Sequence, residues 1–160
     1  MITKEHIQKT IVEGIVGGFS YHRIRMGDAC VYTSYLTRDL MKRFYNLDVE
    51  LVAGELRFTG LPIAYLWNPP NEFHMWAKKD KEIIDISIAA LTQRDEFKKG
   101  NRFYKFKDCE IGVVWEEEPY CGQIYTEIEK GLNKIESPVD AEDYIDILNY
   151  AIKYIENYNR

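Results

Sequence analysis

The first part of the chain carries apolar residues at helical spacing. Ile7, Ile11 and Ile15 recur at every fourth position after Thr3, which predicts an amphipathic helix with Thr3 as its N-cap. Gly17-Gly18 follows the last of these apolar positions, so we expect the helix to end there.

A second helix is predicted by the same spacing. Asp28 is its expected N-cap, and the helix is expected to close near Asn46. Three apolar residues four positions apart would face the core: Leu36, Leu40 and Phe44. Cys30 therefore falls in the first turn of this helix.

The middle of the chain changes to strand-like and loop-like patterns. Residues Val49 to Phe58 alternate and are rich in β-forming types, which predicts a strand. The stretch from Thr59 to Asn71 is rich in proline and glycine and predicts a long loop. Long irregular connections inside compact domains are often functional, so this loop is of interest.

Two short strand-like runs, Phe73 to Lys78 and Glu82 to Ser87, predict a hairpin. With a two-residue turn at Lys79-Asp80, His74 would pair directly with Asp85. Side chains alternate between the two faces of a strand, so His74, Trp76, Ile83 and Asp85 share one face. The residues between them form a uniformly apolar face that is expected to pack on the core: Phe73, Met75, Ala77, Ile84 and Ile86.

The last part of the chain is less regular. A short helix is expected from Ile88 to Lys99, and strands from Phe103 to Phe106 and from Ile111 to Trp115. Apolar residues between Ile124 and Ile135 have helical spacing, and Ser137-Pro138 is expected to open a terminal amphipathic helix. The whole pattern predicts an α+β fold in which helices flank a small antiparallel sheet.

Composition narrows the class of protein. The length of 160 residues favours one domain spanning 1–160, and 46% hydrophobic and 29% charged residues are ordinary for a globular chain. The formal net charge of −5 argues against a nucleic-acid-binding surface, which is normally basic. We find no run of 18 apolar residues and expect no membrane span. Three cysteines without the spacing of a disulfide framework favour a reducing compartment, so we expect a cytoplasmic protein.

Three residues carry the candidate chemistry: Cys30, His74 and Asp85. A thiol is a useful nucleophile as the thiolate, which both a helix N-terminus and a neighbouring imidazole favour. The imidazole in turn needs a partner that fixes its tautomer, and a carboxylate on the adjacent strand can reach it. The backbone N–H of Cys30, at a helix start, is a natural donor to an oxyanion.

Each of these residues also has a purely structural interpretation. Cys30 could be an inert core residue, because free cysteine is among the most buried residue types. His74 could be a structural histidine whose hydrogen bonds are satisfied. Asp85 is harder to explain in this way, because aspartate is depleted in strands and is costly to bury without a partner. His74 is the best partner that the sequence offers.

A zinc site is the weaker alternative. Cys109 and Cys121 with a histidine could supply three ligands, but their spacing of 12 matches no tight ligand pair such as CxxC. We therefore expect neither a metal nor another cofactor.

The order of these motifs resembles the transglutaminase-like superfamily of papain-type cysteine enzymes. Gly27 to Cys30 opens a helix, His74-Met75-Trp76 lies on a strand, and Ile84-Asp85-Ile86 lies on the next, a pattern that spans roughly residues Gly27 to Ser87. Small bacterial members, such as the leader-removing peptidases of lasso-peptide pathways, are the most similar in character.

The resemblance implies a papain-like core, with the helix that bears the cysteine packed on the sheet that bears the histidine and aspartate. It also implies acyl transfer, with Cys30 as nucleophile, His74 as general base and acid, and Asp85 as the residue that orients the imidazole. Trp76 would form a wall of the site beside the histidine. No glutamine or tryptophan lies a few residues before Cys30 to donate to an oxyanion, and Tyr21 is the substitute that we consider.

The reaction and the partner remain open at this point. A peptide, amide or acyl substrate fits a peptidase, an amidase, a deamidase or an acyltransferase, and the oligomeric state is undetermined. The alternative of a different class is a binding or inhibitory module on the same fold with a vestigial triad.

Overall fold

The sheet that organises the molecule follows the order β2-β1-β3-β4-β5, and β6 also pairs with β1. The computed structural model describes residues 1–117 and 122–160, and every strand pairing in it is antiparallel. The strands are β1 Glu50–Phe58, β2 Ala64–Tyr65, β3 His74–Lys79, β4 Glu82–Asp85, β5 Val114–Glu117 and β6 Gln123–Glu127. The α-helices are α1 Lys4–Tyr21, α2 Cys30–Tyr45 and α3 Glu142–Tyr158. Short 3-10 segments are η1 Ser87–Gln93, η2 Asp95–Phe97, η3 Tyr104–Phe106 and η4 Gly131–Lys134.

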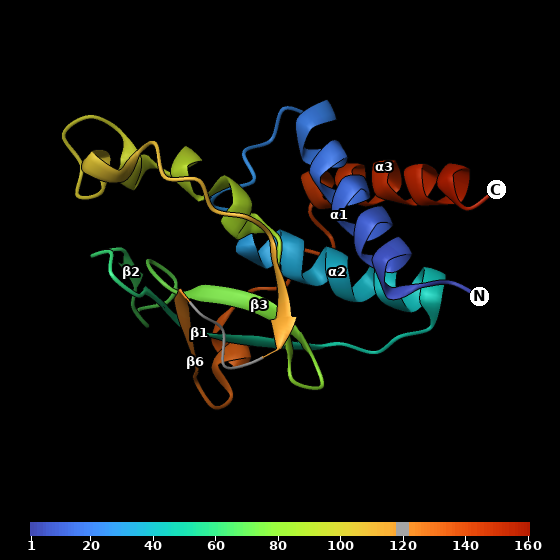
Figure 1. The fold of residues 1–160 in the computed structure, drawn as a ribbon, viewed down its shortest axis with the longest axis horizontal. Helices are drawn as coiled ribbons and strands as arrows, with labels where there is room; N and C mark the ends of the chain where they lie inside the picture. The colour runs from blue at the N-terminus through green and yellow to red at the C-terminus, as the bar shows by residue number, and fades with distance from the viewer. Residues whose placement is uncertain (118–121) are drawn as a thin grey trace.

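Helices α1, α2 and α3 lie on one side of this sheet (Figure 1). Helix α2 lies against β3, and α1 and α3 pack on each other and on α2 farther from the sheet. The expected α+β class is therefore confirmed, and the helix that begins with Cys30 packs on the strand that begins with His74. None of the helices in the described ranges is both long enough and apolar enough to cross a membrane.

Two apolar clusters cover the two faces of the sheet. Met75, Ala77 and Ile84 belong to the cluster shared with the α-helices, which is the face that the alternation predicts for them. Trp76 and Ile83 belong to the other cluster, together with apolar residues from the 3-10 segments. The segment from η1 to η3 therefore covers the face on which His74 and Asp85 lie.

Helix α1 begins as predicted, because the Thr3 hydroxyl accepts the His6 N–H at 3.1 Å. The prediction that Gly17-Gly18 ends this helix is wrong, since it continues to Tyr21. A Cβ on Gly18 would lie 2.8 Å from the Ile147 side chain on α3. These glycines therefore allow two helices to approach closely and do not terminate the first.

The N-cap of helix α2 lies one residue later than predicted. Ala29 is the N-cap and makes no side-chain hydrogen bond, whereas Asp28 forms an ion pair with Arg25. An arginine three residues away satisfies the carboxylate, so it is not available to cap the helix. Cys30 is consequently the first residue of α2.

The hairpin register differs from the predicted one by two residues. Lys79 pairs with Glu82, so the turn consists of Asp80 and Lys81. Asp80 has a φ of 55°, a left-handed conformation that aspartate tolerates better than most residues. Extending this register places Asp85 diagonal to His74 instead of directly opposite. A shift of two residues keeps every side chain on its predicted face, and diagonal neighbours remain within reach of long side chains.

The segments on both sides of β5 differ most from the predicted elements. Residues 124–135 do not form the predicted helix, because they contain β6 and the short segment η4. The predicted strand Phe103 to Phe106 is part of a 3-10 turn, and the terminal helix begins at Glu142, after Ser137-Pro138. The Ile-Tyr-Thr run in β6 is made of strand-favouring types, so local β propensity prevails over the four-residue spacing there.

Candidate functional site

Cys30, His74 and Asp85 meet at one end of α2 and the adjoining end of the sheet. Cys30 is the first residue of α2, His74 is the first residue of β3, and Asp85 is the last residue of β4. All three are nearly inaccessible, with exposed fractions of 5%, 3% and 2% respectively. The structure therefore brings together three residues that are separated by up to 55 positions in the sequence.

The contact between His74 and Asp85 is a buried ion-pair hydrogen bond. His74 Nε2 lies 2.6 Å from Asp85 Oδ2. A short distance of this kind is typical of charge-assisted hydrogen bonds. Because Nε2 is held by the carboxylate, Nδ1 is the ring nitrogen left to face Cys30.

Cys30 lies close enough to the His74 ring to influence the charge of that ring. Burial lowers the pKa of His74, but the charge and hydrogen bond of Asp85, and then those of Cys30, raise it above its ordinary value. The ring therefore holds a proton at neutral pH and places a positive charge near Cys30.

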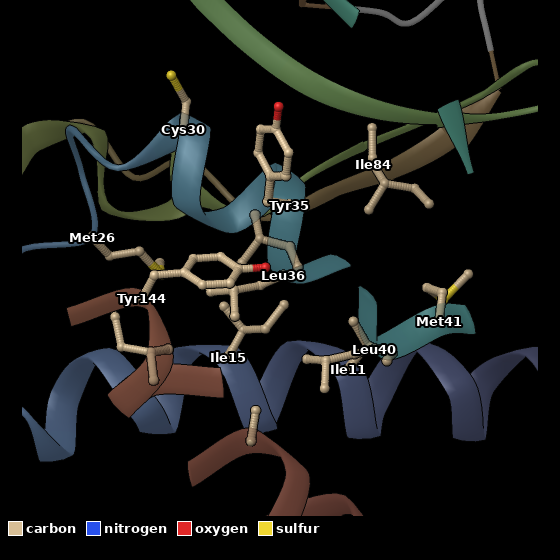
Figure 2. Close-up of a cluster of buried hydrophobic side chains, with 14 of the residues drawn as sticks. Ile11, Ile15, Met26, Cys30, Tyr35, Leu36, Leu40, Met41, Ile84 and Tyr144 are labelled. Atoms are coloured by element: carbon tan, nitrogen blue, oxygen red, sulfur yellow. The ribbon is translucent and has the colours of Figure 1, made fainter. Parts of the chain in front are cut away.

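The position of Cys30 on the helix adds to this effect. The first backbone bond of the helix is donated by Thr33 to Ala29, so the N–H groups of residues 30–32 have no partner inside the helix. Figure 2 shows the sulfur of Cys30 pointing away from Met26 and Tyr144, which pack beneath it. A carbonyl oxygen placed beside the sulfur could therefore accept from the Cys30 N–H.

Asp85 has two further donors that the sequence analysis did not identify. The Tyr125 hydroxyl donates to Asp85 Oδ2 at 2.8 Å, and the Ser87 hydroxyl donates to Oδ1 at 3.4 Å. Tyr125 comes from β6, and its ring centroid lies 6.0 Å from that of His74. The sequence signal that could have revealed Tyr125 is the strand-favouring composition of β6, which the helical interpretation obscured.

Gly54 on β1 makes room for this arrangement. It pairs with His74 on one side and with Glu127 on the other, so β6 passes next to the histidine. A Cβ on Gly54 would lie 1.9 Å from the backbone oxygen of Thr126. Only a residue without a side chain allows β6 to bring Tyr125 over Asp85.

The segment that leads into Cys30 is anchored by Gln93 at the end of η1. The Gln93 side-chain oxygen accepts the N–H groups of Met26 and Gly27 at 3.1 and 3.0 Å. Gly27 also packs tightly on η1, since a Cβ there would lie 2.2 Å from the Ala90 oxygen. This anchor fixes the chain three residues before the nucleophile.

Arg94, the next residue, places a positive charge near the site. Its guanidinium lies over the Tyr65 ring at 4.5 Å and bonds to Glu96 through two nitrogens. Burial lowers the pKa of Arg94, but the Glu96 hydrogen bond and nearby charges, that of Cys30 among them, raise it. Arg94 is therefore within electrostatic reach of the sulfur and adds a second positive charge near it.

The two predicted substrate-binding residues have different outcomes. Trp76 stacks on His74, with ring centroids 6.0 Å apart and planes 23° apart, but only 2% of it is exposed. It supports the histidine from within the core and presents no surface to a substrate. Tyr21 is 71% exposed and packs against Tyr150 and His22, so the structure does not place it with the Cys30 group as an oxyanion donor.

Metal ligation was the weaker alternative in the sequence. Across residues 1–117 and 122–160, no group of three or more histidine, cysteine, aspartate or glutamate side chains is arranged to hold a metal ion. Cys109 is partly exposed, and Cys121 lies outside the described residues.

Comparisons with known proteins add no relative. No family model, no curated protein and no solved structure matches the chain. The geometry of the site is therefore the basis for a functional proposal.

Proposed function

We propose that the protein is a cysteine-dependent acyl-transfer enzyme of the transglutaminase-like type, with a papain-like core. The observation that carries the proposal is that His74 is held by Asp85 at 2.6 Å while Cys30, at the start of the adjoining helix, influences the same imidazole. The position of the cysteine at the start of a helix that packs on the strand of the histidine supports the papain-like arrangement.

In the first step the Cys30 thiolate attacks the carbonyl carbon of an amide or ester. The carbonyl electrons move to oxygen, and the N–H of Cys30 at the free end of α2 stabilises the resulting oxyanion. When the tetrahedral intermediate collapses, the bond to the leaving group breaks and His74 gives its proton to that group. The product is a thioester on Cys30 and a neutral His74 ring.

In the second step the neutral His74 removes a proton from water or from an amine. The nucleophile attacks the thioester carbon, the carbon–sulfur bond breaks, and Cys30 returns to the thiolate beside a protonated His74. Asp85 holds Nε2 throughout, which keeps Nδ1 directed at the reacting atoms. Water as the second substrate makes the protein a peptidase or amidase, and an amine makes it an acyltransferase.

The competing function is a binding module in which the three residues are structural. The low exposure of Cys30 is the observation that favours it, since Cys109 is more accessible. The two functions therefore predict opposite orders of thiol reactivity: activation favours Cys30, and exposure alone favours Cys109.

The test is alkylation by iodoacetamide at pH 6, followed for each cysteine by mass spectrometry of the native protein. The proposal predicts that Cys30 reacts at least about tenfold faster than Cys109 and Cys121, because it is the thiolate in a thiolate–imidazolium pair. His74→Ala should remove this preference. His22→Ala, at the end of α1, is the matched control and should keep it.

Two results would contradict the proposal. One is a Cys30 that becomes reactive only when denaturant unfolds the protein, as expected of an inert core residue. The other is a preference for Cys30 that survives His74→Ala.

A further inference from the structure

A hollow of about 450 Å³ is lined by the chain neighbours of two residues of the candidate catalytic group. It lies between the first turn of α2, the residues just before β3 and the residues just before α3. Its apolar lining comes mainly from six residues: Val31, Tyr32, Phe73, Ile135, Pro138 and Ala141. Lys134 and Glu136 at the same hollow have opposite charges, so the hollow has no strong preference for an ion of either sign.

The hollow is adjacent to both reacting residues along the chain. Val31 follows Cys30 directly, and Phe73 precedes His74 directly. Consecutive Cα atoms are about 3.8 Å apart, so the wall of the hollow begins one residue from the nucleophile and one residue from the base. A second hollow, of about 500 Å³, lies between the ends of α1 and α3 and includes neither of these flanking residues.

The lining is suited to an apolar group. Val31, Tyr32 and Phe73 are half-buried and pack against the core cluster of the α-helices, as do Ile135 and Ala141. The walls are therefore held by packing before anything binds. Sites that take small ligands are typically preformed, mostly apolar hollows of about 300–1,000 Å³, and this one falls in that range.

We propose that this hollow is the subsite that receives an apolar side chain or acyl chain of the substrate whose carbonyl Cys30 attacks. The inference rests on the proposed function and adds the chemical class of the substrate. A neutral, apolar group next to the scissile carbonyl would lie between Val31 and Phe73, with the carbonyl directed toward the sulfur. Substrates with a charged group at that position would be poor.

The test uses maleimides that differ in their N-substituent. The Cys30 thiolate adds to the maleimide double bond, forming a carbon–sulfur bond while the neighbouring carbon takes a proton. We compare N-methylmaleimide with N-hexylmaleimide at pH 6 and measure the rate ratio at each cysteine by mass spectrometry. The proposal predicts a hexyl-to-methyl ratio at Cys30 about tenfold higher than at Cys109, because five added methylenes enter an apolar site.

Variants locate the effect. Ala141→Trp fills the hollow and should reduce the hexyl-to-methyl ratio at Cys30 to that of Cys109. Ile135→Glu adds a carboxylate to another wall of the hollow and should reduce the ratio in the same way. Val139→Glu is the matched control, since Val139 lies in the same segment but does not line the hollow, and it should keep the high ratio.

The outcomes separate this inference from the function on which it rests. Equal hexyl-to-methyl ratios at Cys30 and Cys109 would overturn the subsite, and so would a high ratio at Cys30 that persists in both Ala141→Trp and Ile135→Glu. In either case, selective alkylation of Cys30 by iodoacetamide would still support the proposed enzyme. Loss of iodoacetamide selectivity overturns both.

Discussion

Tyr125 donates its hydroxyl proton to the same oxygen of Asp85 that holds His74. The strand that carries Tyr125 lies beyond β1 from the histidine, so three strands contribute to the geometry of one carboxylate. This sharing makes Tyr125 a positioning residue that acts through Asp85.

Removing the Tyr125 hydroxyl should change how the alkylation rate of Cys30 depends on pH in the acid range. In Tyr125→Phe the carboxylate of Asp85 loses the donor that helps to fix its Oδ2, which weakens its hold on the charged His74. We expect the acid-side midpoint of the alkylation rate profile to move to higher pH by roughly one unit. The measurement is the rate of iodoacetamide alkylation between pH 4 and 8.

Tyr144→Phe is the matched control for this experiment. Its hydroxyl, on α3, donates to a different carboxylate, that of Asp39, at 2.7 Å, so its removal leaves the Tyr125–Asp85 hydrogen bond intact. Both variants should lose about 1.5–3 kcal/mol of unfolding free energy, since each removes a hydrogen bond to a charged group. Identical alkylation profiles in the two variants would show that Tyr125 has only a structural role.

The raised pKa of His74 predicts how stability depends on pH. The folded state holds the proton more tightly than the unfolded chain, whose ordinary value is 6.5. The stabilisation is therefore complete below about pH 6.5 and is lost as pH rises through the folded-state pKa. In a Cys30→Ser protein, which removes the thiol from the proton balance, the unfolding free energy should fall between pH 7 and 9 by up to about 1.4 kcal/mol per pH unit from this group.

Asp85→Asn should remove most of that slope, because it removes the main cause that raises the pKa of His74. It should also lower the unfolding free energy at pH 6 by about 3 kcal/mol, as expected when one partner of a buried pair is lost. Urea unfolding at pH 6, 7, 8 and 9 of Cys30→Ser proteins with and without Asp85→Asn measures the two effects. Parallel curves for these two proteins would contradict the ionised pair.

Gln93 should stabilise the segment before Cys30 through its side-chain oxygen. Gln93→Ala leaves two buried N–H groups, of Met26 and Gly27, without their acceptor, which should lower the unfolding free energy by about 2 kcal/mol. Selective alkylation of Cys30 should decrease as well. Gln93→Glu keeps an acceptor at the same place and should retain most of the stability, so equal losses in the two variants would argue against the anchor.

The contact between α1 and α3 offers a test of the packing. Gly18→Ala should lower the unfolding free energy by about 1–2 kcal/mol, because the new Cβ meets Ile147 at 2.8 Å. Gly14→Ala, one turn earlier, meets Ala151 at an ordinary 3.5 Å and should raise it by up to about 1 kcal/mol through helix propensity. Thermal unfolding of both variants measures the difference, and equal effects would contradict the close approach.

The sequence predicts correctly those features of the candidate site that depend only on the alternation of side chains between the two faces of a strand. Whether Asp85 shares a face with His74 depends on the two-residue period of strands, which is readable from the sequence and is insensitive to a slip of two residues. The exact pairing was not predictable, because it depends on which turn residue adopts the left-handed conformation, and Asp80 does so in the structure.

Tyr125, Gln93 and Gly54 could not be assigned from sequence for a different reason. Each contributes through contacts with segments more than 20 residues away, and none carries a local pattern that names its partner. Gly17 and Gly18 illustrate the same limit, since a glycine that admits a neighbouring helix resembles in sequence a glycine that ends one.

The tight turn at Asp80 and Lys81 has a consequence for changes in the length of this hairpin. Deleting or inserting a single residue there would exchange the sides of Ile84 and Asp85, bringing a carboxylate against the helices and leaving the imidazole without its acceptor. Adding or removing two residues would preserve which side each faces. Chains descended from the same ancestor that keep the pair of His74 and Asp85 should therefore differ in this connection by even numbers of residues.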